Sequence, residues 1–125
     1  IVNIIGNGGK VASPTHLAGG AANAALMLAT VGLANAYAGR GVRIVGLNPG
    51  LTQTGRVSEG MKAVAASQGI SEHEALRRAR DSIPIGRLAD PAEIASVVAF
   101  LCSAKASYVT GVVINMDGAS VPIVV

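Results

Sequence analysis

Two short segments of this 125-residue chain hold the side chains best suited to chemistry. In the first, His16 stands near the beginning of a predicted helix, and Asn23 follows on the same helix. Histidine is the side chain that most readily exchanges protons near neutral pH, and an asparagine amide both donates and accepts hydrogen bonds. In the second, Pro-Gly-Leu-Thr-Gln-Thr at 49–54 follows a predicted strand, which is where open parallel sheets bind ligands. These residues predict a small-molecule site with proton-transfer chemistry.

The composition narrows the classes of function. Charged residues make up 14% of the chain, aromatic residues make up 2%, and the formal net charge is +3, so no nucleic-acid partner is expected. The even spread of apolar residues excludes a disordered tail. The single cysteine, Cys102, excludes a disulfide framework and favours the reducing cytoplasm, and no cysteine–histidine spacing indicates a metal. Cys102 lies on the apolar side of a predicted helix and is expected in the core.

One long segment raises the question of a membrane span. No Asp, Glu, Lys or Arg occurs from Val11 to Gly39. The segment is mostly alanine and glycine, however, with Asn23, Thr30 and Asn35 distributed around the helix, and asparagine opposes insertion into lipid. We therefore expect a helix buried against a sheet in a cytoplasmic protein, with no membrane partner.

The first half of the chain predicts a βαβ unit. Two β-branched strands, 1–5 and 42–48, flank one long helix that begins at Ser13-Pro14 and ends at 37–38. Strands joined through a helix pair in parallel with a right-handed crossover. The fold class expected from this order is α/β with a parallel sheet.

The second half adds helices and one more strand. Ser71 and Asp90 each precede a glutamate by three residues, which is the capping-box pattern at a helix start. A third strand is predicted at 112–116. Three strands make an incomplete sheet, and the chain begins at Ile1 inside a strand, so we expect a fragment of a larger domain.

Three segments carry motifs in a fixed order. They are VRIVGLNPGLTQT at 42–54, IPIGRLADPAEIASVVAFLCSAKASYVTG at 83–111 and VVINMDGA at 112–119. Their order and spacing resemble the C-terminal half of the short-chain dehydrogenase/reductase family, in which Pro-Gly ends a strand and Asp-Gly follows the last one. The resemblance covers nearly the whole chain. It implies a Rossmann-like, doubly wound parallel sheet, of which this chain supplies three strands.

The catalytic residues of that family are missing here. The family uses a serine and a Tyr-x-x-x-Lys pair, and the corresponding positions hold Gly6, Gly19 and Asn23. Spacing of four residues places a tyrosine and a lysine on one helix face, where they act together in proton transfer. His16 is a candidate substitute for the tyrosine. The alternative interpretation of His16, a histidine that is hydrogen-bonded in the first helical turn without touching substrate, stays open.

The resemblance also implies a cofactor site for NAD or NADP. Its predicted residues are Asn23, Pro49, Gly50, Leu51, Thr52 and Thr54. Asn23 would bind a ribose hydroxyl, or it would satisfy backbone groups after the loss of the lysine. The backbone after Pro49 would bind the nicotinamide carboxamide, with Thr54 as a second contact.

The predicted function is an NAD(P)-dependent oxidoreductase with an atypical active site that acts on a carbonyl or alcohol. The alternative is a catalytically inactive family member that serves as a nucleotide-binding or oligomer-partner subunit. Residues 1–125 are expected to form the C-terminal part of a single dinucleotide-binding domain, with 55–82 as the substrate-covering region. Three arginines in that region, Arg77, Arg78 and Arg80, are interpreted as a solvated helix face. A homo-oligomer, either a dimer or a tetramer, is expected.

Overall fold

A three-stranded parallel sheet organises the computed structural model, which describes residues 1–124. The strands lie side by side in the order β1-β2-β3, with Gly46 of β2 paired to both Asn3 and Val113. The fold class and the parallel pairing predicted from the sequence are therefore confirmed. The elements are β1 (Val2–Ile4), η1 (Asn7–Gly9), α1 (Leu17–Tyr37), η2 (Ala38–Arg40), β2 (Val45–Pro49), α2 (Gly55–Gln68), α3 (Glu72–Asp81), α4 (Pro91–Cys102), η3 (Ala104–Ala106) and β3 (Val113–Met116).

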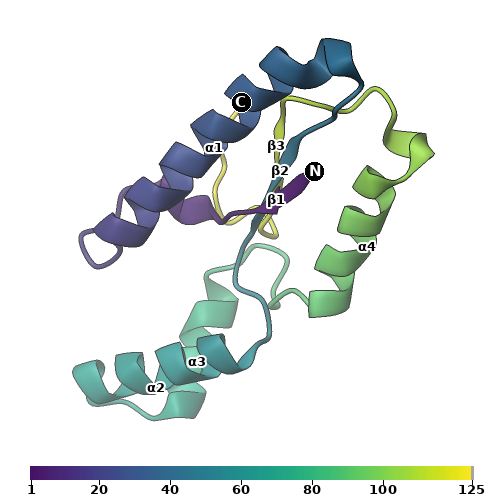
Figure 1. The fold of residues 1–125 in the computed structure, drawn as a ribbon. Coiled ribbons are helices and arrows are strands. Elements are labelled where there is room, and N and C mark those ends of the chain that lie inside the picture. The colour runs from purple at the N-terminus through teal and green to yellow at the C-terminus, as the bar shows by residue number, and fades with distance from the viewer. Residues whose placement is uncertain (125) are drawn as a thin grey trace.

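Helices cover the sheet on both faces. Figure 1 shows α1 on one side of the strands and α4 on the other, while α2 and α3 pack together beyond the carboxyl ends of the strands. The core lies between α4 and the sheet, where Val45 and Leu101 are each 1% exposed. The apolar stripe of α4 faces this core because Ile94, Val97 and Leu101 recur at helical spacing.

The start of α1 differs from the prediction. We expected Ser13 to cap the helix, but α1 begins at Leu17 and His16 occupies the N-cap position. The Ser13 hydroxyl instead lies 3.0 Å from the Thr15 hydroxyl, and the Ser13 carbonyl accepts a hydrogen bond from the His16 amide. These local bonds hold residues 13–16 in a turn, because serine and threonine side chains compete with helix formation.

The burial of α1 is also less than predicted. Thr30 and Ala34 are its buried residues, whereas Leu28 is 77% exposed. A polar bond fixes the helix to the sheet, since the Thr30 hydroxyl accepts from Asn3 Nδ2 at 2.9 Å. The segment Leu17–Arg40 is long and apolar enough to cross a membrane. Length and apolar composition alone are weak evidence for a membrane span, because the core helices of other proteins share both. The expectation of a buried Cys102 was wrong, since its side chain is exposed.

The two capping boxes predicted for α3 and α4 form to different degrees. Asp90 and Glu93 form a complete capping box at α4, with Pro91 in the first turn, as predicted. At α3 the Ser71 hydroxyl accepts from the Glu74 amide, but the Glu74 carboxylate binds Arg77. The polar region before α3 also contains α2, a helix that the sequence patterns did not indicate.

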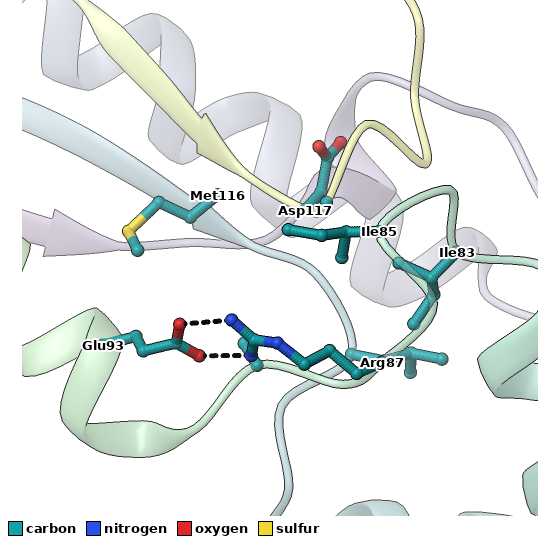
Figure 2. Close-up of a pocket in the computed structure, with 9 residues that line it drawn as sticks. Ile83, Ile85, Arg87, Glu93, Met116 and Asp117 are labelled. Carbon is teal, nitrogen blue, oxygen red and sulfur yellow. Dashed lines mark hydrogen bonds and ion pairs between the residues drawn. The ribbon is translucent and has the colours of Figure 1, made fainter.

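The Glu93 carboxylate joins the α4 cap to the preceding loop. It forms two bonds of 2.7 and 2.8 Å with the Arg87 guanidinium, as Figure 2 shows, and accepts from the Asp90 amide at 2.8 Å. The Arg87 hydrogen bond, followed by the Asp90 backbone, lowers the pKa of Glu93 to about 2. Because the folded state holds the ionised form, the stabilisation is present at neutral pH and is lost as the pH falls toward 2.

We predict that Glu93→Gln lowers the melting temperature at neutral pH and that its difference from wild type shrinks between about pH 4.5 and pH 2. Glutamine can still cap Asp90 but cannot pair with the arginine as an anion. Thermal unfolding across this pH range measures the effect. Glu59→Gln, at an exposed glutamate of α2, is the control. A difference that stays constant down to pH 2 would contradict the prediction.

Candidate functional site

A cavity of about 600 Å³ lies at the carboxyl ends of β1 and β2. This volume is within the usual range for small-molecule sites, and the place is where open parallel sheets bind ligands. The cavity brings together most of the predicted site residues from three separate segments. Those that line it are Gly6, His16, Gly19, Asn23, Pro49, Gly50 and Leu51.

The His16 imidazole occupies the space over Gly19. A Cβ atom built on Gly19 would lie 2.5 Å from His16 Nε2 and in closer contact with Cε1. A Cβ on Gly8 would lie 2.8 Å from His16 Cδ2. No real Cβ tolerates such distances, so the two glycines make the room in which this ring lies. The sequence predicted His16 near the start of the helix, and in the structure its ring forms part of the cavity lining.

The Asn23 amide lies toward Gly6 and Gly8 in the loop after β1. Its Nδ2 atom would be 3.2 Å from a Cβ on Gly6 and 3.5 Å from a Cβ on Gly8. Asn23 is half-buried and lines the same cavity as His16. Two polar side chains, the His16 imidazole and the Asn23 carboxamide, thus line the same cavity.

Close backbone packing joins η1 to α1. A Cβ on Gly9 would meet the Ala24 amide nitrogen at 2.6 Å, and one on Gly20 would meet the Gly8 carbonyl oxygen at 2.7 Å. Both contacts are with rigid backbone, so a larger residue would force the loop and the helix apart. The glycine pair at 19–20 therefore serves contacts within this chain.

A chain of polar bonds supports the cavity floor from below. Fully buried Asn48 accepts from the Gly6 amide through Oδ1 at 3.1 Å and donates from Nδ2 to Asn115 Oδ1 at 3.3 Å. The same Asn115 oxygen accepts from Lys10 Nζ at 3.0 Å. Beside it, Asn7 Nδ2 donates to Asp117 at 2.7 Å. These hydrogen bonds hold the loop after β1 in place beneath the cavity. Sequence reasoning missed this network because its members lie far apart along the chain.

Two of the predicted cofactor residues lie outside this cavity. Thr54 caps α2, where its hydroxyl accepts from the Val57 amide at 3.4 Å, and it lines a separate hollow between α2 and α3. The Thr52 hydroxyl donates to the Gly50 carbonyl at 3.1 Å. Gly50 itself is required by packing, since its Cβ would lie 2.8 Å from the Asp117 Cα.

Another functional candidate, Arg56, was missed by the sequence analysis. It lies in the first turn of α2 and lines the cavity from the side opposite the sheet's own loops. The arginines singled out from the sequence do not reach the cavity lining: Arg77 and Arg78 are exposed and bind the Glu74 carboxylate at 2.8 Å. In residues 1–124 no group of three His, Cys, Asp or Glu side chains could hold a metal ion.

A smaller cavity of about 160 Å³ lies next to the site, between β3 and the loop before α4. Figure 2 shows Ile83, Ile85 and Met116 around it, with Arg87 and Glu93 paired to each other. Because its main charged groups already bind one another, this hollow offers mostly apolar surface.

The comparisons with known proteins agree with this architecture. A family model described as enoyl-(acyl carrier protein) reductase matches residues 1–119. The chain is 33% identical over 120 residues to the NADPH-dependent reductase BacG of Bacillus subtilis, covering 96% of this chain and 46% of that protein. It is 38% identical over 118 residues to the 3-oxoacyl-[acyl-carrier-protein] reductase FabG of Aquifex aeolicus, covering 94% of this chain and 41% of the relative.

A solved structure shows the same fold. A short-chain dehydrogenase family protein from Francisella tularensis superposes with a TM-score of 0.91 at 31% identity, covering 96% of this chain and 50% of the other. The parallel sheet and its covering helices define an α/β protein with a Rossmann-like fold. This chain belongs to the short-chain dehydrogenase/reductase family. It spans less than half the length of the two curated relatives described above.

We predict that the effect of Gly19→Ala depends on His16. Replacing a helical glycine by alanine raises the free energy of unfolding by up to about 1 kcal/mol. In the His16→Ala background the new methyl group has room and this gain is realised, whereas with His16 present the ring must move and the gain is smaller. Urea unfolding of the four variants in the cycle measures the coupling.

Gly32→Ala serves as the control for this cycle, because a Cβ at Gly32 has nothing within 4 Å. Its effect should be the same with and without His16. Equal effects of Gly19→Ala in both backgrounds would show that the imidazole does not occupy the space over Gly19.

Proposed function

We propose that the protein is an NAD(P)-dependent oxidoreductase that interconverts a small carbonyl compound and its alcohol. In this proposal residues 1–125 form the C-terminal part of one dinucleotide-binding domain. The observation that carries it is the His16 imidazole over Gly19, at the position of the family's catalytic tyrosine and inside the cavity at the sheet's carboxyl edge. Membership of an oxidoreductase family and likeness to an NADPH-dependent reductase support the cofactor class.

His16 is proposed as the proton donor. A nicotinamide cofactor, when bound, would supply the hydride that reduces the carbonyl carbon. The protonated imidazole gives its N–H proton to the carbonyl oxygen, which completes the alcohol, and solvent returns a proton to the exposed ring. The reverse direction uses neutral His16 as the base.

The remaining predicted residues are proposed to hold the cofactor. Asn23 can donate to or accept from a ribose hydroxyl, although as a neutral amide it cannot replace a lysine's charge. Beside Asn23 the cavity is lined by Pro49, Gly50 and Leu51. Their backbone is therefore proposed to bind the nicotinamide. Thr52 and Thr54 carry less support, because their hydroxyl groups already serve Gly50 and the α2 cap.

Residues 55–82 are proposed to cover the substrate. They form α2 and α3, which lie beyond the carboxyl ends of the strands in Figure 1. Arg56 at their beginning and Ser82 at their end both line the cavity. A segment in contact with the cavity at both ends is well placed to shield reacting groups from water.

An inactive family member is the second candidate function. Gly6 and Gly19 bring no side chain to the site, and Asn23 brings no charge. In this alternative the protein binds the dinucleotide or an active subunit without turnover, and the His16 ring fills space.

We predict that His16→Ala lowers the turnover of NADPH or NADH oxidation with a panel of ketones and aldehydes by at least about tenfold, because general acids commonly contribute more than this factor. Calorimetry should show that dinucleotide binding by this variant stays within about twofold of wild type. The protein in its natural length is used. His73→Ala, which changes the other histidine outside this cavity, is the control and should leave turnover unchanged.

Three other outcomes of these measurements would favour the inactive family member or reject both candidate functions. Turnover that His16→Ala leaves unchanged would remove His16 from catalysis. Binding of dinucleotide without any turnover would favour the inactive member, and the triple variant His16→Ala, Gly19→Tyr, Asn23→Lys should then gain activity. The first substitution is needed because the tyrosine would collide with the imidazole. Absence of binding to either dinucleotide would reject both functions.

We also propose that the protein is a cytoplasmic homo-oligomer, a dimer or a tetramer. The outer side of α1 exposes Leu17 and Leu28, and an apolar surface of this kind is normally covered by a partner. Leu28→Glu is expected to lower the mass measured by light scattering to that of a smaller species, while Ala63→Glu on the exposed side of α2 leaves it unchanged. A wild-type monomer would contradict this proposal.

A further inference from the structure

The cavity at the carboxyl edge has an unbalanced charge. Arg56 lines it together with His16, and none of its described lining residues is an aspartate or a glutamate. Arg56 is exposed in the first turn of α2, and within residues 1–124 no carboxylate forms an ion pair with it. By contrast, Arg77 and Arg87 each bind carboxylates at 2.6–2.8 Å. The guanidinium of Arg56 therefore keeps its hydrogen-bond donors for a ligand.

Two hydroxyl donors of the cavity wall are already in use. The Ser82 hydroxyl donates to the Ala79 carbonyl at 2.7 Å, and the Ser120 hydroxyl donates to the Asp117 carbonyl at 2.6 Å. Apolar residues such as Ile5, Leu51 and Ile83 also line the cavity. A ligand with one anionic group and a small apolar body matches this distribution of charge and donors.

We propose that Arg56 is an anion subsite, which binds the carboxylate or phosphate of a small carbonyl substrate whose carbonyl oxygen faces His16. The inference rests on the proposed function, because both residues line one cavity. A planar guanidinium binds such groups through two parallel hydrogen bonds, which selects for an oxyanion over a neutral ester. The diphosphate of a bound dinucleotide has the same chemistry, and the experiment below separates the two sources.

The test compares acetoacetate with methyl acetoacetate, which share the carbonyl group and differ in charge. Ligand-observed NMR titration of the natural-length protein, with and without NADPH, should give binding of acetoacetate about tenfold tighter than the neutral ester. Arg56→Gln is expected to abolish this preference. Arg56→Lys should retain a part of it, because the positive charge remains while the second parallel hydrogen bond is lost.

Lys62→Gln is the matched control, since it removes one positive charge from the exposed side of the same helix without touching the cavity. It should keep the full preference for acetoacetate. Thermal unfolding of Arg56→Gln checks that the variant is folded. Equal binding of the two compounds to wild type, or a preference that survives Arg56→Gln, would overturn the proposal.

A second arm measures the affinity for NADH and NADPH. We expect Arg56→Gln to leave both within about twofold of wild type. A tenfold loss of dinucleotide affinity, with the preference for acetoacetate intact, would assign Arg56 to the cofactor and overturn the proposal. Because these are binding measurements, a protein without turnover that still prefers acetoacetate through Arg56 would reject the proposed reaction and keep the subsite.

Discussion

The close packing of η1 on α1 is the constraint on which the site depends. Gly9 and Gly20 let two backbones approach to distances that no side chain would permit. This contact fixes the loop after β1 to the first half of the helix, and so it fixes the distance between Gly8 and Gly19. The space between those two glycines is what the His16 ring fills. A residue with a Cβ at Gly9 or Gly20 would widen the cavity floor even though neither residue has a side chain to offer to chemistry.

The polar network under the floor complements this backbone contact. Asn48 is fully buried, and burying an amide costs free energy unless its hydrogen bonds are satisfied. Here both ends of the amide have partners, Gly6 on one side and Asn115 on the other. The network therefore ties the loop after β1 to β2 and β3 in one geometry. The glycine contact holds the floor against α1, and the amide network holds it against the sheet.

Much of the fold could be predicted from local patterns, whereas the site could be predicted only in part. The strands and the α4 cap follow from β-branched runs and from the Asp90–Glu93 pair, whose physics is local. The start of α1 could not be read from Ser13, because a competing turn takes that hydroxyl. The apolar composition of α1 was also a poor guide to its burial. Its buried residues are Thr30 and Ala34, whereas Leu28 is largely exposed.

In the site, too, features set by nearby residues could be predicted, whereas features set by the path of the whole chain could not. The resemblance to the family predicted that Gly6, Gly19 and Asn23 belong to one site, and all three line the same cavity. Spacing alone cannot show that the His16 ring turns back over Gly19, since that depends on the turn at 13–16. Nor does it bring Arg56 to the cavity, because the path of the chain after Gly50 is set by α2, a helix without a strong apolar period.

The Asp117 carboxylate, in the loop after β3, does not offset the positive charge of Arg56 in the cavity, because its hydrogen bonds are made within its own surroundings. Asp117 accepts from Asn7 at 2.7 Å and from the Ala119 and Val121 amides at 3.0 and 3.2 Å. Those bonds hold Ala119 at a φ of 67°, a left-handed conformation that costs a non-glycine residue about 1 kcal/mol or more. The carboxylate is thus committed to folding its own loop, whose Ser120 and Val121 form part of the cavity wall. Its charge is compensated locally by three N–H donors, so an anion entering the cavity meets Arg56 and His16 without a free carboxylate beside them.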